Sequence, residues 1–243
     1  MHSPMEQFEI KRLLDFRIGS LDASYTNSAL WMTIAVILAF LLFVVGTQRK
    51  ALIPGRAQAM AELGYEFVAG MLRDNVGDAG KKYFPFVLTL FVFILFCNVL
   101  GLVPYSFTPT SHIIVTFAMA AVVFVGVTVI GFARHGLHFL SFFVPSGVPL
   151  WLLVILVPIE VISYFVRPFS LSIRLFANML AGHTMLKVFG GFVVMMGILG
   201  GWAPLAFVVA LTGLELLIAF LQAYVFAILS CIYLNDALNL HAH

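Results

Sequence analysis

Charged residues are scarce in this chain: Asp, Glu, Lys and Arg make up 10% of its 243 residues, whereas 62% are hydrophobic. A soluble domain of this size could not shield so much apolar side chain from water. The scarcity of charge therefore excludes a soluble globular protein and predicts one that crosses a membrane several times. The net charge of +2 gathers in no basic patch, so no nucleic-acid partner is expected.

Cysteine is equally scarce, and the two that occur, Cys97 and Cys231, lie inside apolar runs. They are interpreted as small buried hydrophobic residues, so neither a disulfide framework nor a metal site is expected. No Gly-rich phosphate loop occurs, and therefore no nucleotide site or other cofactor is predicted. The N-terminal segment 1–28 is mixed in charge and lacks the apolar core of a signal peptide. It is predicted to be a tail outside the membrane, with the first span directing insertion.

Long apolar runs predict an all-α membrane protein with five transmembrane helices in a single membrane domain, 1–243. An amphipathic segment after the first span is expected to lie in the plane of the interface, with a helical hairpin on the soluble side as the alternative. The last two helices are too long to cross upright, so they are predicted to form a steeply tilted hairpin, with Pro158 and Pro168 as possible kinks. The predicted segments are the tail 1–28, the span 29–47, the interfacial helix 55–80, the spans 83–104 and 112–134, and the long helices 150–194 and 202–238. A glycine-rich loop, 190–201, is expected between the last two.

Basic residues indicate the orientation. The connection between the first two spans contains Arg49, Lys50, Arg56, Arg73, Lys81 and Lys82. The next loop on the same side contains Arg134, whereas the loops 105–112 and 190–201 contain no Lys or Arg. The positive-inside rule places the basic connections in the cytoplasm, and five spans then put the N-terminus in the periplasm and the C-terminus in the cytoplasm. A bacterial inner membrane is predicted, with the mitochondrial inner membrane as the alternative.

Polar residues interrupt the apolar sequence most clearly in PIEVISYFVRPFSLSIRLFANMLAGH, which starts at Pro158. A charge at the centre of a membrane helix costs about 2.5–3.5 kcal/mol, so charges here indicate function. Glu160, Arg167 and Arg174 are seven residues apart and therefore share one helical stripe. Three uncharged polar residues lie on the same stripe: Ser163, Ser170 and Asn178. The pattern predicts a polar seam along an otherwise apolar helix.

A structural role has to be weighed for each charge in this helix. Arg174 has long apolar runs on both sides, so its side chain cannot easily reach a headgroup, and function is favoured. Arg167, nearer the helix start, is equally compatible with snorkelling to the interface, and snorkelling is favoured for Lys187. His183 is nine residues past Arg174, which turns it to roughly the opposite face about 13 Å further along the axis. A second polar environment is therefore predicted around His183.

The last helix has a polar face of its own. Glu215 and Gln222 are seven residues apart, and Tyr233 follows eleven residues later, so the three align. By the predicted orientation Glu215 and His183 lie in the same outer half of the membrane, where they could form a proton-relay pair. The alternative is a structural hydrogen bond between packed helices. The relay is favoured, because titratable groups are a costly choice where Asn or Ser would serve.

Three motifs resemble subunit a of the F-type ATP synthase, in particular its mitochondrial and related bacterial members. They are FSLSIRLFANMLAGH around Arg174, LQAYVFAILSCIYL from Leu221 and NVLGLVPYSFTPT from Asn98. The resemblance covers most of the chain from the second span onward, and the arginine motif is its most specific part. The N-terminal tail and the first span add little to it.

The resemblance implies a stator subunit that conducts protons, is not an enzyme by itself, and couples proton flow to ring rotation and ATP synthesis. The implied partners are a ring of c subunits, the b-type subunits of the peripheral stalk and the rest of the complex, within a lipid membrane. Arg174 is the implied barrier between two offset half-channels that lead to the ring carboxylates. The outer half-channel is implied at Asn98, His183, Glu215 and Gln222, and the inner one at Glu160, Ser163, Ser170, Asn178 and Tyr233.

Two positions differ among members of the family. Some bacterial members carry a glutamate at the position of His183 and a histidine at the position of Glu215, which preserves the pair with the roles exchanged. Some members also place an acid three residues after the asparagine of the second span, where this chain has Gly101. Proton uptake is therefore expected to depend on Asn98, His183 and Glu215.

Two other functions compete with this interpretation. An ion-coupled secondary transporter would also place charges at mid-membrane, but it predicts two related halves, and no internal repeat is visible. A structural subunit of another respiratory complex predicts no seam of titratable residues. Proton or sodium selectivity and the number of ring subunits are properties of other chains.

Overall fold

The structure is a computed structural model that describes residues 9–15, 17–18, 21–22, 24–48, 54–103, 106–144 and 149–239. Within them, five helices are long and apolar enough to cross a membrane, which confirms the all-α membrane fold. They comprise α1 (Asn27–Gln48), α3 (Phe84–Gly101), α4 (Ile113–His135), α5 (Leu150–Gly200) and α6 (Trp202–Leu238). The basic pair Arg49 and Lys50, Pro104 at the predicted end of the second span, and residues 1–8 of the predicted tail lie outside the described residues.

Short strands precede the first helix, an addition to the predicted tail. β1 (Arg12–Leu14) pairs with β4 (Tyr25–Thr26), and β2 (Arg17–Ile18) pairs with β3 (Leu21–Asp22), both antiparallel. Asn27 joins this hairpin to α1, because its Oδ1 accepts hydrogen bonds from the backbone N–H of Lys11 (3.2 Å) and of Ser28 (2.9 Å). Such bonds satisfy donors that a helix start leaves free. The hairpin therefore determines where α1 begins.

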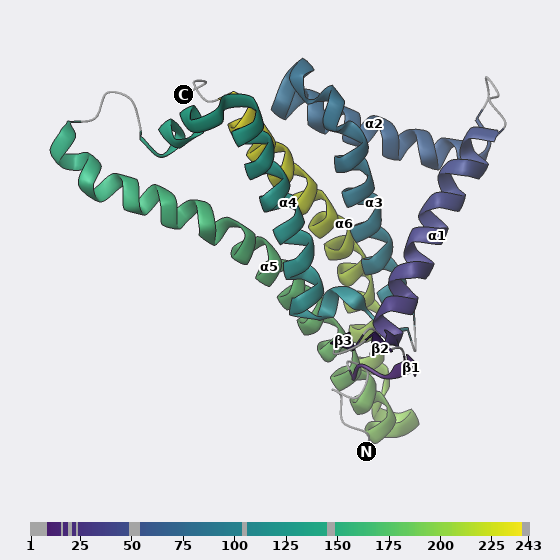
Figure 1. The fold of residues 1–243 in the computed structure, drawn as a ribbon. Helices are drawn as coiled ribbons and strands as arrows, with labels where there is room; N and C mark the ends of the chain where they lie inside the picture. The colour runs from purple at the N-terminus through teal and green to yellow at the C-terminus, as the bar shows by residue number, and fades with distance from the viewer. Residues whose placement is uncertain are drawn as a thin grey trace.

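The amphipathic segment forms α2 (Arg56–Val76), followed by the 3₁₀ helix η2 (Gly77–Tyr83). α2 lies across the ends of α1 and α3 (Figure 1) and packs against α1, α3 and α6. Its apolar face buries Val68, Met71 and Leu72, while Glu62 and Glu66 on the other face are exposed. The helix ends at Gly77, whose positive φ of 71° suits glycine. The position of α2 in the plane of the interface stays a prediction.

The long hairpin of α5 and α6 differs from its predicted form at the connection. The expected loop began at residue 190 and the expected helix ended at residue 194, whereas α5 continues through Gly190 and Gly191 to a break at Gly197 (φ 61°, ψ −162°). In apolar surroundings a helix satisfies the backbone hydrogen-bonding groups of glycine within the segment itself. The helical conformation therefore has the lower free energy, and glycines such as Gly190 and Gly191 remain in it. Pro158 and Pro168, the predicted kinks, keep helical backbone angles in a continuous α5. α5 runs diagonally across α4 and α6 (Figure 1).

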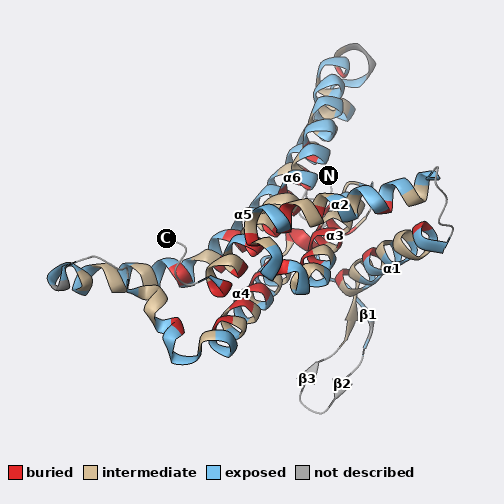
Figure 2. Cartoon of the chain, turned by 90° about the horizontal axis from the view of Figure 1, so that it is seen from above, coloured by how far each residue is buried: buried red, intermediate tan, exposed pale blue. Residues whose placement is uncertain are grey.

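The core is built around α6, which packs against α2, α3, α4 and α5. Ala219, Ala223 and Ala227 are fully buried at four-residue intervals, so one stripe of α6 has side chains small enough for close helix approach. Figure 2 shows the buried residues concentrated where α3, α4 and α6 meet, while the projecting arms are mostly exposed or half-buried. Cys97 and Cys231 are buried and unbonded to each other, as expected for small hydrophobic residues.

Candidate functional site

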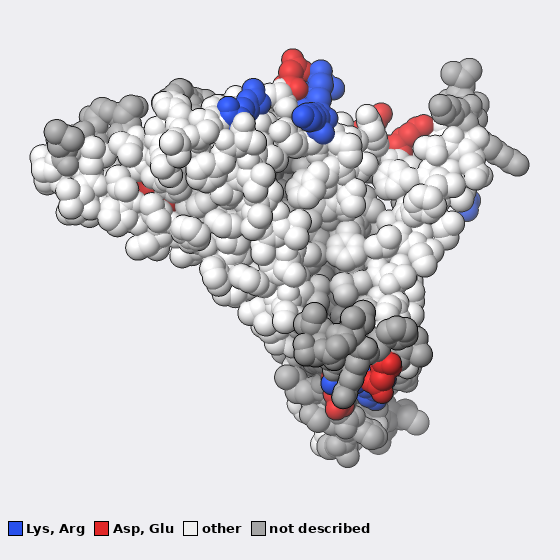
Figure 3. All heavy atoms as spheres, viewed as in Figure 1, with Lys and Arg blue, Asp and Glu red and all other residues white. Residues whose placement is uncertain are grey.

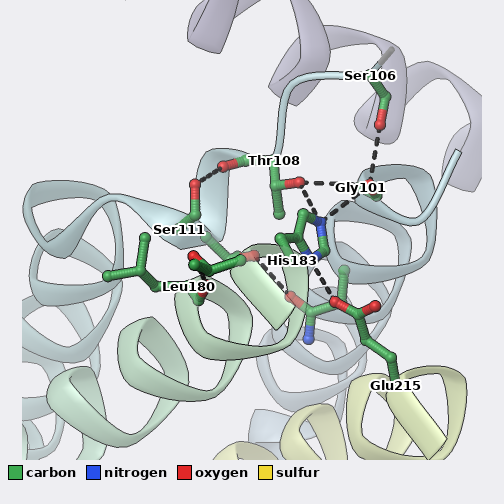
Figure 4. A network of polar contacts seen from close by, with 10 residues as sticks. Gly101, Ser106, Thr108, Ser111, Leu180, His183 and Glu215 are labelled. Atoms are coloured by element: carbon green, nitrogen blue, oxygen red, sulfur yellow. Dashed lines mark hydrogen bonds and ion pairs between the residues drawn. The ribbon is translucent and has the colours of Figure 1, made fainter. Parts of the chain in front are cut away.

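His183 on α5 and Glu215 on α6 form a buried pair at the lower end of the helix bundle (Figure 4). The Nδ1 of His183 contacts Oε1 of Glu215. On its other side, Nε2 of His183 lies 3.0 Å from the carbonyl oxygen of Gly101 and 2.7 Å from Oγ1 of Thr108. The Gly101 carbonyl can only accept a hydrogen bond, so Nε2 carries a hydrogen. The proton shared between Nδ1 and Glu215 is therefore the one that the pair can exchange.

The position of Gly101 beside this pair leaves no room for a side chain. A Cβ at position 101 would lie 2.5 Å from Oγ1 of Thr108, closer than any real contact. The acid that some family members carry at this position would thus displace Thr108, which contacts His183 here. The contact between Thr108 and His183 therefore depends on a glycine at position 101.

Asn98 connects α3 with α6 one turn from Glu215. Its side chain is fully buried, its Nδ2 donates to the carbonyl oxygen of Ala219 (3.2 Å), and its Oδ1 accepts from Oγ1 of Thr110 (2.8 Å). Thr108 and Thr110 are buried in the turn after α3, together with Ser111, whose hydroxyl donates to the Thr108 carbonyl (2.6 Å). Sequence reasoning did not single out these hydroxyls, although a run of polar residues between two apolar helices was a usable signal.

Gln222 and Asn178 are also brought together, although the sequence analysis assigned them to different half-channels. Nδ2 of Asn178 donates to Oε1 of Gln222 at 3.1 Å, so α5 and α6 are bridged one turn past Arg174. Gln222 is buried, whereas Asn178 is exposed at the edge of the contact. Two polar atoms on this face of α6, Oε2 of Glu215 and Nε2 of Gln222, are buried and have no hydrogen-bond partner among the described residues.

Arg174 lies on an exposed part of the α5 surface, one turn before Asn178. Arg174 is exposed, as are its neighbours Ile173 and Ala177, whereas Leu175 and Met179 on the other face are fully buried. Among the described residues Arg174 takes part in no ion pair, so neither Glu160 nor Glu215 acts as its structural partner. A guanidinium ion is thus held on an outward-facing, apolar helix surface, where an isolated charge is costly.

The remaining residues of the predicted seam differ in how far they are buried. Ser163 and Ser170 are exposed on α5, Glu160 is half-buried, and Arg167 turns inward. Nη1 of Arg167 forms an ion pair with Oδ2 of Asp236 at 3.0 Å. Snorkelling, one alternative for Arg167, is therefore wrong, because the ion pair holds the side chain against α6. Lys187 is exposed near the far end of α5, and its role stays a prediction.

Aromatic rings surround the Arg167–Asp236 pair. The guanidinium carbon lies 5.2 Å from the ring centre of Tyr233, 5.8 Å from that of Tyr164 and 5.9 Å from that of Phe142. Tyr233 therefore contacts the arginine, about five turns along α6 from Glu215. Asp236 was missed by sequence reasoning, although it extends the polar face of α6 one turn beyond Tyr233. The described residues contain no group of His, Cys, Asp and Glu that could hold a metal ion.

Comparisons with known proteins agree with the resemblance noted in the sequence. The family model described as "ATP synthase A chain" matches residues 29–235. An "ATP synthase subunit a" of Rhodospirillum rubrum is 59% identical over 241 residues, which cover 99% of this chain and 100% of that protein. One of Pelagibacter ubique is 58% identical over 240 residues, 98% of each chain. One of Mesorhizobium japonicum is 57% identical over 242 residues, 97% of this chain and 96% of the relative.

Proposed function

This chain belongs to the ATP synthase A chain family, and we propose that it conducts protons through two half-channels separated by Arg174. As a family member it is a multi-pass membrane subunit of an F-type ATP synthase. The proposal concerns how it works there: protons reach and leave the carboxylates of a rotating c-subunit ring, and their flow drives ATP synthesis by other subunits. The observation that carries it is Arg174, which is exposed on the apolar face of α5, forms no ion pair with any described residue, and lies one turn from the Asn178–Gln222 bridge.

The outer half-channel begins at His183 and Glu215. The two groups are buried in contact, and Nε2 of His183 is held by Gly101 and Thr108, so the imidazole has a fixed orientation for exchanging its Nδ1 proton with Glu215. Asn98 holds α6 against α3 one turn from Glu215 and keeps the carboxylate in place. A histidine and a carboxylate that share a proton can pass one on without an isolated charge forming in the interior.

From Glu215 the proton moves along α6 towards Gln222. Oε2 of Glu215 and Nε2 of Gln222 are buried without partners in the described part of the chain, and buried polar groups of this kind are usually satisfied by ordered water. Water between the two groups, two helical turns apart, would carry the proton to the Asn178–Gln222 bridge. Asn178 then marks the place where the outer path reaches the exposed face of α5.

Arg174 acts on the ring carboxylate that arrives at this face. A neutral carboxylic acid faces lipid at low cost, whereas the anion does not, so each carboxylate must be protonated before it leaves the subunit. The guanidinium ion stays charged at every accessible pH and favours the ionised carboxylate in front of it. The same charge repels protons that would pass directly between the half-channels. Rotation is then the only path for protons.

The inner half-channel runs along the earlier part of α5, at Glu160, Ser163 and Ser170, with Tyr233 on α6. Arg167 and Asp236 do not need to carry protons, because their ion pair and the surrounding rings hold the two helices together beside this path. The basic connections around α2 and the end of α4 support a cytoplasmic location for this side in a bacterial cell. The peripheral-stalk b-type subunits are the further proposed partners.

Cysteine cross-linking tests whether this face of α5 meets the ring. Ile173→Cys and Ala177→Cys, both exposed beside Arg174, are expected to form disulfides with a cysteine placed next to the ring carboxylate. Leu175→Cys and Met179→Cys are the matched controls, because both side chains are fully buried on the opposite face. Strong cross-links from the control positions, or none from positions 173 and 177, would contradict the proposed contact. The native Cys97 and Cys231 are buried and do not interfere.

Gly182→Ala is expected to slow proton flux severalfold by disturbing the His183–Glu215 pair. A Cβ at position 182 would lie 2.7 Å from Oε1 of Glu215 and 3.0 Å from its carboxyl carbon, so the carboxylate has to move away from the imidazole. Gly190→Ala is the control on the same helix, because nothing lies within 4 Å of its added Cβ. The measurement is the initial rate of ATP-driven acidification of inverted vesicles. Equal rates for the two variants would show that the carboxylate position is unimportant.

A further inference from the structure

A basic cavity lies between the C-terminal end of α2 and the start of α3, away from the proton path. Its volume is about 310 Å³, and its lining includes Tyr65, Leu72, Arg73, Lys81 and Phe84. In Figure 3 one group of coloured Lys, Arg, Asp and Glu atoms lies along this upper edge and another at the lower end, with a broad and almost uncoloured surface between them. The cavity thus stands where the charged rim of the molecule meets its apolar surface.

Two cations on the cavity wall are available for an anion. Arg73 and Lys81 are both exposed. Nζ of Lys81 lies 2.7 Å from Oδ1 of Asp78, but this pair is exposed on both sides and is therefore weak. Asp74 on the last turn of α2 and Glu66, next to Tyr65 in the sequence, are also acidic and exposed. A planar guanidinium beside an ammonium group is a combination that recognises phosphate.

The other wall of the cavity is apolar and aromatic. The rings of Tyr65 and Phe84 are packed with their centres 4.6 Å apart, and Leu72 is buried beneath them. Phe84 is the first residue of α3, whose apolar sequence continues from there, with Phe86 40% exposed. A ligand that fits both walls needs an anionic head and an apolar tail that lies along α3.

We propose that this cavity binds an anionic phospholipid, with its phosphate between Arg73 and Lys81 and its acyl chains against the start of α3. Charge complementarity identifies the headgroup, and the junction with an apolar membrane helix at Phe84 identifies a lipid as the source of the phosphate. Asp78 competes with the phosphate for Lys81 and therefore lowers the affinity of the site for the lipid. The site is separate from Arg174 and from the proposed proton path.

The test uses the purified whole complex, reconstituted in phosphatidylcholine with spin-labelled phosphatidylglycerol or spin-labelled phosphatidylcholine as the probe. Electron spin resonance measures the fraction of each probe that the protein holds. Arg73→Gln with Lys81→Gln is expected to lower the preference for phosphatidylglycerol by at least about fivefold, the typical effect of one basic contact near a membrane surface. Arg56→Gln with Lys82→Gln is the matched control, because it removes the same charge from exposed residues that do not line the cavity.

A second variant changes the affinity in the opposite direction. Asp78→Asn removes the competing carboxylate from Lys81 and is expected to raise the preference for phosphatidylglycerol. Loss of structure could not produce such a gain. Three results would overturn the proposal. Equal losses of phosphatidylglycerol preference in the two double variants would show general attraction to the charged surface, and an unchanged preference in Asp78→Asn would show that Lys81 does not bind the lipid. Displacement of the labelled lipid by millimolar glycerol 3-phosphate would identify a site for soluble phosphate compounds.

Discussion

Arg174→Ala is expected to reduce ATP-driven proton pumping below about a tenth of the parent rate, while ATP hydrolysis persists and passive proton leak stays equal or rises. A nearby guanidinium favours the ionised form of a carboxylate by about 10- to 1,000-fold, so its removal leaves the ring acids protonated as they pass. The same removal takes away the positive charge that keeps protons from crossing between the half-channels. Both effects follow from one property of Arg174, namely a charge on the exposed surface of α5 that no described residue neutralises.

Inverted vesicles that carry the whole complex allow pumping, leak and hydrolysis to be measured together. Arg56→Ala is the control, because it removes an exposed arginine from the start of α2, outside the proposed path. The combination of lost pumping, preserved hydrolysis and undiminished leak identifies a barrier residue. If Arg174→Ala pumps normally, Arg174 is not the barrier, and the two half-channels must be separated by packing alone.

Exchange of the buried pair is the second change with a large expected effect. His183→Glu alone places two carboxylates in contact, and Glu215→His alone places two imidazoles in contact. Each single variant is expected to lose most proton flux, because two like groups replace a matched buried pair and one of them loses its hydrogen-bond partner. The double variant restores one histidine beside one carboxylate and is expected to recover a substantial part of the flux.

This exchange separates a proton relay from a structural hydrogen bond. The relevant comparison is the pH dependence of vesicle acidification in the parent and in the double variant, together with the amount of assembled complex in each membrane. A relay predicts that flux returns with an altered pH profile, because the carbonyl of Gly101 and the hydroxyl of Thr108 then face a carboxyl group instead of an imidazole N–H. A purely structural bond predicts that assembly recovers and that the pH profile is the same as the parent's. Normal flux in either single variant would exclude both roles.

Much of the fold could be predicted because membrane helices depend on local sequence. A segment of about 20 apolar residues forms a helix wherever it crosses lipid, since the lipid offers no other partners for its backbone. The five long helices and the amphipathic α2 could therefore be predicted from the apolar composition of the segments and the helical spacing of their polar residues. The connection of α5 and α6 was misplaced because several glycines occur there, and the sequence pattern does not indicate which of them breaks the helix. The strand pairs before α1 had no comparable signal.

Within the site, helical spacing correctly separated His183 from Arg174, because nine residues turn the helix through about half a circle. Spacing could not reveal the partners. Asp236 is sixty-nine residues from Arg167, and Thr108 is seventy-five from His183. Such pairs depend on how α3, α5 and α6 cross, which no single helix specifies.

The sequence by itself determined the membrane class, the helical architecture and the family, because each rests on runs, periods and motifs that are local in the chain. Only the tertiary structure decided which charges are satisfied and which are not. Arg167 and Arg174 occupy equivalent positions in a seven-residue pattern, yet one is held by Asp236 and the other faces outward without an ion pair among the described residues. The physical reason is that α6 covers one part of α5 and leaves another exposed.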